Sequence, residues 1–140
     1  MSGFLLDTNI IWELIKPKPE AKLTEWVESA DEDLLYLSVL TVGEIRRGIV
    51  AMEQGKRRAA LQSWLETDLE PRFSGRVLPI DEATADRWGA ITGGVAQGIT
   101  VPVVDGLIAA TALQHNLTLV TRNTKNLAGT NVPAFNPWDL

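Results

Sequence analysis

The chain has 140 residues, enough for one domain with one hydrophobic core. It contains no cysteine, which excludes disulfides and thiolate metal sites, and its single histidine, His115, argues against a structural zinc site. Its net charge of −5, from 13 Lys and Arg against 18 Asp and Glu, argues against a basic protein that coats DNA without sequence preference.

The apolar runs and the cysteine content of the chain bear on its cellular location. The opening MSGFLLD holds an apolar run too short for a secretory signal, and no stretch approaches the roughly 18 apolar residues of a transmembrane helix. The lack of cysteine fits a reducing compartment. We therefore expect a soluble, cytoplasmic protein.

Short apolar strands alternate with longer helical stretches along the chain. In the first half we expect strands at 4–6 and 34–38 and helices at 9–15, 20–30, 42–54 and 57–69. In the second half we expect a strand at 76–80, a helix N-capped by Asp81, a helix at 105–115, and strands at 118–121 and near 133–135. This order predicts a single α/β domain over residues 1–140, with a central, mostly parallel β-sheet flanked by α-helices.

Three acidic residues fall at the carboxyl-terminal edge of the predicted sheet, where open sheets bind ligands. Asp7 follows the first strand, Glu44 lies in the first turn of the helix after the second, and Asp105 opens the helix before the fourth. Carboxylates in one crevice repel each other unless a cation such as Mg²⁺ or Mn²⁺ is bound. Because such an ion activates water and polarises phosphoryl oxygens, the pattern favours a metal site that hydrolyses phosphodiesters.

Each acid also has a structural alternative. Asp105 is suited to cap its own helix, Thr41 and Glu44 match a capping box, and Asp7 is a common turn residue. Spacing alone leaves both interpretations open.

Basic residues form two groups in the sequence. They either contact RNA or are solvated helix and loop faces, and the sequence leaves the choice open. The groups are Arg46, Arg47, Lys56, Arg57 and Arg58, and then Arg122 and Lys125.

Four ordered blocks of sequence are more specific than any single acid. They read LLDTNII at 5–11, SVLTVGEIRRGI at 38–49, VVDGLIAATA at 103–112 and LVTRN at 119–123, and NPW follows at 136–138. Across essentially the whole chain, these blocks resemble the PIN-domain ribonucleases, and within them the VapC-like toxins of type II toxin–antitoxin systems.

The resemblance implies Mg²⁺-dependent endonucleolytic cleavage of RNA, with Mn²⁺ as a possible substitute. It implies that Asp7 and Asp105 are the most direct metal ligands and that Glu44 completes the catalytic set, directly or through a water. Supporting roles near the site fall to Thr8, Asn9, Thr121 and Asn123. For Asn9, a role at the helix start is an equally good account.

The last block departs from the family pattern. Many relatives carry a fourth acid two or five residues after its threonine, where this chain has Asn123 and Asn126. An amide oxygen can still ligate Mg²⁺, but it adds no negative charge, so one or two ions remain possible. The amides also motivate an alternative: a catalytically weak or inactive PIN-like module that binds RNA or an antitoxin. A phosphatase of the haloacid-dehalogenase type is disfavoured, because no second aspartate stands two residues after Asp7.

The resemblance implies partners as well as chemistry. A cognate antitoxin would lay an apolar helix in a groove and offer an Arg or Lys to the acidic site. A homodimer is also implied. The five tryptophans are expected mostly in the core, with one or two at an interface.

Overall fold

Five short parallel strands form the centre of the fold, as seen in a computed structural model that describes residues 2–140. They lie in the order β3-β2-β1-β4-β5. Their bounds are β1 (Phe4–Leu6), β2 (Leu35–Ser38), β3 (Val77–Leu78), β4 (Thr118–Val120) and β5 (Ala134–Phe135). The chain moves outward from β1 through β2 to β3, then crosses back to β4 on the other side of β1. The carboxyl ends of β1 and β4 therefore flank the switch point at which open parallel sheets bind ligands.

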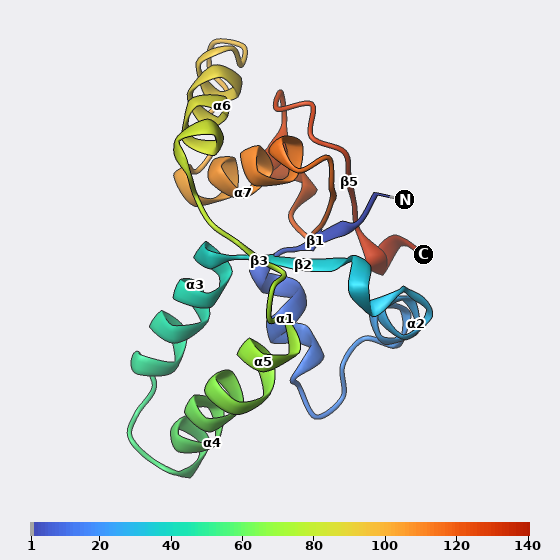
Figure 1. Cartoon of the computed structure of the whole chain (residues 1–140), viewed down its shortest axis with the longest axis vertical. Helices are drawn as coiled ribbons and strands as arrows, with labels where there is room; N and C mark the ends of the chain where they lie inside the picture. The colour runs from blue at the N-terminus through green and yellow to red at the C-terminus, as the bar shows by residue number, and fades with distance from the viewer. Residues whose placement is uncertain (1) are drawn as a thin grey trace.

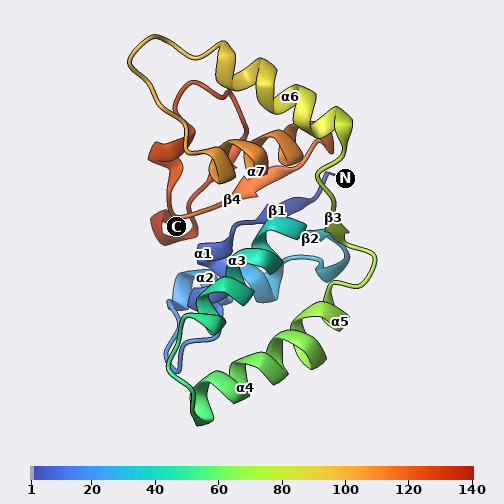
Figure 2. The same cartoon turned by 90° about the vertical axis from the view of Figure 1, so that its left-hand side faces the viewer.

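Helices cover both faces of the sheet, which confirms the predicted α/β class (Figures 1 and 2). One face carries α6 (Glu82–Gly93) and α7 (Val103–Gln114). The other carries α1 (Thr8–Leu14), α2 (Ala21–Ser29), α3 (Val39–Val50), α4 (Lys56–Trp64) and α5 (Glu70–Arg72). Shorter helical turns are the 3₁₀ turns η1 (Glu32–Leu34), η3 (Thr124–Leu127) and η4 (Pro137–Asp139) and the π turn η2 (Leu65–Leu69).

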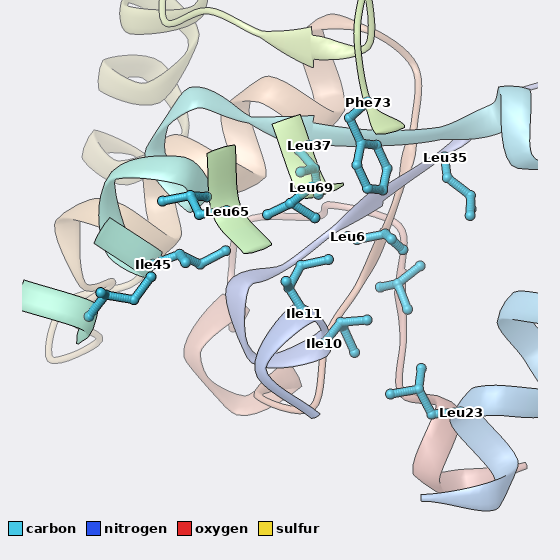
Figure 3. Close-up of a cluster of buried hydrophobic side chains, with 12 residues drawn as sticks. Leu6, Ile10, Ile11, Leu23, Leu35, Leu37, Ile45, Leu65, Leu69 and Phe73 are labelled. Carbon is cyan, nitrogen blue, oxygen red and sulfur yellow. The ribbon is translucent and has the colours of Figure 1, made fainter. Parts of the chain in front are cut away.

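Two hydrophobic cores form because successive strand residues point to opposite faces. Leu6 belongs to the larger core, which includes Ile45 and Phe73 and is drawn in Figure 3. Its neighbour Leu5 belongs to the smaller core, which includes Ile108. Both strand residues are essentially inaccessible to solvent. A strand buried on both faces has to be apolar throughout, which is why β1 reads as a continuous apolar run.

Helix α3 begins three residues earlier than predicted. The predicted capping box of Thr41 and Glu44 is therefore wrong. Ser38 is the N-cap, because its hydroxyl oxygen accepts a hydrogen bond from the Leu40 N–H at 3.0 Å. Thr41 and Glu44 thus lie inside the helix, and Glu44 belongs to its second turn rather than its first. The earlier start frees the Glu44 carboxylate from any capping role.

Other boundaries differ in smaller ways. The predicted helix at 57–69 continues through the π turn η2 into α5 and ends at Arg72. Strand β3 spans only two residues of the predicted five. The predicted N-cap Asp81 is confirmed, because it accepts a hydrogen bond from the Thr84 N–H at 2.9 Å. The helix predicted at 105–115 is α7, which ends at Gln114 with His115 as its C-cap.

All five tryptophans are partly buried and none is fully buried. Trp12, Trp26, Trp64 and Trp138 pack against the larger core. Within residues 2–140, no helix is both long enough and apolar enough to cross a bilayer.

Candidate metal centre

Asp7 stands at the switch point, directly after β1, and both of its carboxylate oxygens are hydrogen-bonded. Oδ1 accepts from the Thr8 N–H at 2.8 Å, which makes Asp7 the N-cap of α1. Oδ2 accepts from the Thr121 hydroxyl at 2.7 Å and from the Asn9 amide at 3.3 Å. The residue is only 7% exposed. Asp7 thus has the structural role of a cap and also presents a buried carboxylate at the ligand-binding edge of the sheet.

The electrostatic environment of Asp7 links the three acids. Burial raises the pKa of Asp7 above its usual value of 3.8, and the hydrogen bonds from Thr121 and Thr8 oppose that rise. The negative charges of Asp105 and Glu44 raise the pKa further. The three carboxylates therefore interact in space, and a bound cation would relieve their repulsion.

Glu44 is oriented toward this region by a threonine of α1. The Thr8 hydroxyl donates to Glu44 Oε1 at 2.6 Å and lies 3.1 Å from the Thr41 hydroxyl oxygen. Thr8 immediately follows Asp7, so this contact ties the Glu44 carboxylate on α3 to the end of β1. Sequence reasoning missed the part played by Thr41, although it precedes Glu44 by three residues and therefore shares its helix face.

Asp105 enters the site from the opposite layer of helices. It is the third residue of α7 and Pro102 is the N-cap, so the interpretation of Asp105 as an N-cap is wrong. The side chain is partly buried, as predicted. Its Oδ2 accepts a hydrogen bond from the Asn126 side-chain amide at 3.1 Å. Asn126 therefore faces the acidic site, and its nitrogen rather than its oxygen contacts Asp105.

The polar side chains after β4 complete the network. The Asn9 amide nitrogen lies 3.2 Å from the Thr121 hydroxyl, and its oxygen accepts from the Arg122 N–H at 3.1 Å. The Thr121 hydroxyl also accepts from the Asn123 N–H at 3.0 Å. Asn9 and Thr121 thus fix the Asp7 carboxylate from two directions and join α1 to the loop after β4.

These side chains are chemically suited to a hard divalent cation, because all their candidate ligand atoms are oxygens and the charges of two other carboxylates act on the buried Asp7. Among the residues that the structure describes, no three acidic or histidine side chains lie close enough to hold an ion jointly. Binding through all three acids therefore requires side chains to move. The assignment of Asp7, Glu44 and Asp105 as joint ligands stays a prediction.

Comparison with known proteins places this arrangement in a family. The PIN domain family model matches residues 4–130. The chain is 40% identical to Toxin FitB of Neisseria gonorrhoeae and 38% identical to the VapC ribonuclease Y4jK of Sinorhizobium fredii, in each case over 96% of this chain and 97% of the relative.

Solved structures agree with the sequence comparison. The crystal structure of FitAcB from Neisseria gonorrhoeae matches with a TM-score of 0.93 at 40% identity, over 98% of this chain and 99% of that one. A toxin–antitoxin complex from Klebsiella pneumoniae matches with a TM-score of 0.69 at 26% identity, over 96% and 98%. With its acids placed as described, this chain belongs to the PIN domain family, and VapC-type toxins are among its relatives there.

Proposed function

We propose that the chain is a Mg²⁺-dependent endoribonuclease that acts as the toxin of a type II toxin–antitoxin pair. The observation that carries the proposal is the buried Asp7 carboxylate, whose pKa is raised by burial and by the charges of Asp105 and Glu44. A full-length relative named a VapC ribonuclease supports RNA as the substrate.

In this proposal Asp7 and Asp105 hold the ion, and Glu44 completes the set directly or through a water. A divalent ion held there would supply the Lewis acidity that activates water and polarises a phosphoryl oxygen. Thr121 and Asn9 keep the Asp7 carboxylate in one orientation, because both donate to its Oδ2. Thr8 does the same for Glu44. These neutral donors fix the acids without neutralising their charge.

The partners follow from the relatives. One similar structure is a toxin–antitoxin complex, and the FitB relative is itself named a toxin. We infer a cognate antitoxin for this chain, which blocks the acidic site with a basic side chain. We also propose that the chain forms a homodimer and acts in the cytoplasm, where its RNA substrate would be found.

The chemistry is tested by incubating single-stranded RNA with the purified protein in Mg²⁺, in Mn²⁺ and in EDTA. The parent should cleave with either metal and not in EDTA, and Asp7→Asn should cleave at least 100-fold more slowly. Asp33→Asn is the matched control, because Asp33 is exposed and lies in η1. Cleavage by Asp7→Asn at the parental rate refutes the assignment.

The biological role is tested separately in cells. Expression of the parent should arrest growth and expression of Asp7→Asn should not. Co-expression of the protein encoded by the neighbouring reading frame should restore growth. Growth arrest by Asp7→Asn at the parental level would exclude a nuclease toxin.

The second candidate function is a PIN-like module that binds RNA or an antitoxin without cutting. The amides of Asn123 and Asn126, at positions where many relatives carry an acid, favour it. RNA binding with no turnover across a range of metals would support this alternative.

A further inference from the structure

A polar cavity lies beside the acidic site and has no role in the proposal above. It has a volume of about 430 Å³. Its lining comes from the loop and 3₁₀ turn after β4 and from the segment after β5, namely Arg122, Asn123, Thr124, Lys125, Asn126, Asn136 and Asp139. Because β1, β4 and β5 are parallel neighbours, this cavity opens at the same sheet edge as Asp7. We refer to it as the β4–β5 cavity.

Hydrogen bonds join the wall of the β4–β5 cavity to the acids. Asn126 donates to Asp105 at 3.1 Å, and the Arg122 N–H donates to Asn9, which in turn contacts Asp7. A molecule that fills the cavity therefore contacts Asn126, the hydrogen-bond partner of Asp105. The cavity is also of the size that encloses a small organic group, about 300–1,000 Å³.

Two cations line the cavity and neither is held by a close ion pair in the described part of the chain. The pKa of Glu13 is nonetheless lowered by its hydrogen bond with Lys16 and, to a smaller extent, by the charge of Arg122. Within residues 2–140, Arg122 and Lys125 form no ion pair, whereas Lys16, Arg46, Arg72 and Arg76 each do. Arg122 is nevertheless held in place, because its guanidinium lies over the Trp138 ring, with 4.8 Å between Cζ and the ring centroid. A stacked guanidinium keeps its N–H edges available for an anion. One acid, Asp139, lines the same cavity, so cations exceed acids there.

Neutral hydrogen-bonding groups complete the lining. The Asn123 side-chain amide and the Thr124 hydroxyl make no hydrogen bond within the described part of the chain, so both are free to contact a ligand. Amides and hydroxyls recognise base edges and ribose hydroxyls in single-stranded RNA, and cations bind its phosphates. Single-stranded RNA therefore matches both the cations and the neutral groups of the lining.

Resting on the proposed function, we propose that the β4–β5 cavity is the subsite for the nucleotide next to the cleaved phosphodiester. Arg122 and Lys125 each bind one of the two phosphates that flank its ribose, and Asn123 contacts its base or ribose. The acids thus attract the metal cation while the adjacent cavity attracts the anionic backbone, which lays the strand across the site in one direction.

The test measures RNA binding rather than turnover. Asp7→Asn protein in Mg²⁺ is titrated into a fluorescent 12-nucleotide single-stranded RNA of mixed sequence, and anisotropy is followed at several salt concentrations. Adding Arg122→Gln and Lys125→Gln should weaken binding at least tenfold. It should also reduce the slope of log affinity against log salt by about 1.4, because each phosphate contact to single-stranded nucleic acid contributes about 0.7.

The matched control is the pair Lys18→Gln and Arg87→Gln, which removes the same charge from exposed residues that lie outside the cavity and outside both basic groups of the sequence. This control should leave affinity and salt slope within twofold of the Asp7→Asn protein. Because replacing Arg122 also removes its stacking on Trp138, Lys125→Gln is measured alone as well. This single variant should show half of the slope change of the double variant. Unaltered melting temperatures establish that each variant is folded.

Each outcome decides the proposal independently of catalysis. Equal loss in the control pair, unaltered binding in the cavity variants, or no RNA binding at all overturns the subsite. Binding of a poly-glutamate peptide that depends on Arg122 and Lys125, without RNA binding, assigns the cavity to an acidic protein partner instead. Cavity-dependent RNA binding supports the subsite even where the parent fails to cleave RNA, and in that case it is the proposed nuclease activity that fails.

Discussion

Replacing Thr121 with valine removes one hydroxyl at nearly constant volume and tests how Asp7 is held. Thr121 is 1% exposed, and its hydroxyl donates to Asp7 Oδ2 at 2.7 Å while accepting from the Asn123 N–H at 3.0 Å. In the variant, the charged Oδ2 keeps only the longer bond from Asn9 at 3.3 Å. A buried carboxylate oxygen is thus left poorly satisfied.

The expected loss of unfolding free energy at neutral pH is about 2–4 kcal/mol. A hydrogen bond to a charged group contributes about 1.5–3 kcal/mol, and the neutral bond from Asn123 adds about 0.5–1.5 kcal/mol. For a chain of this size the loss corresponds to a drop in melting temperature of roughly 8–16 °C.

The loss depends on pH in a defined direction. Burial already raises the pKa of Asp7 in the folded state above 3.8, so the protonated carboxyl favours folding and that contribution disappears as pH rises through the folded-state pKa. The Thr121 hydrogen bond lowers this pKa, so its removal raises the pKa further. The difference between parent and variant therefore grows as pH rises through the parent's folded-state pKa and becomes constant above the folded-state pKa of the variant.

The assay is urea unfolding from pH 4 to pH 8 without divalent metal. Thr111→Val is the matched control, because Thr111 is also fully buried and its hydroxyl donates to the neutral Leu107 carbonyl oxygen at 2.8 Å. The control should lose about 1 kcal/mol at every pH. A Thr121→Val loss that is equally flat across this range would refute the account of Asp7.

Three further predictions concern metal, positioning and packing. Asp7→Asn should abolish the gain of about 2.7 kcal/mol in unfolding free energy that the parent shows when Mg²⁺ is 100-fold above its Kd; a parental response to Mg²⁺ contradicts this. Thr8→Val removes the hydroxyl that orients the Glu44 carboxylate, so it should weaken Mg²⁺ affinity about 10–100-fold, as measured by calorimetry. Gly3→Ala should lower the unfolding free energy by about 1–3 kcal/mol, since its Cβ would lie 2.5 Å from the Leu34 carbonyl oxygen, whereas Gly43→Ala meets nothing within 4 Å and should not destabilise.

Much of the fold was predictable because its signals are local. Strands buried on both faces read as apolar runs, and β1, β2 and β4 were found within a residue or two. Asp81 was identified as a cap because an N-cap depends only on one side chain and the backbone N–H groups of the helix that follows it. The acids Asp7 and Asp105 were selected by their positions at strand and helix ends, and the structure places both at the expected edge of the sheet.

Tertiary contacts decided what local signals left open. Thr41 and Glu44 have the spacing of a capping box, but Ser38 starts α3 and the Thr8 hydroxyl, 36 residues away from Glu44 in sequence, orients its carboxylate. Likewise, Asn126 contacts Asp105 only because η3 packs on α7. Local spacing by itself determined the elements and the residue types at their ends. The strand order, and with it the partners of each carboxylate, was set by burial of both sheet faces, since hydrogen bonds between distant segments exist only after the chain has packed.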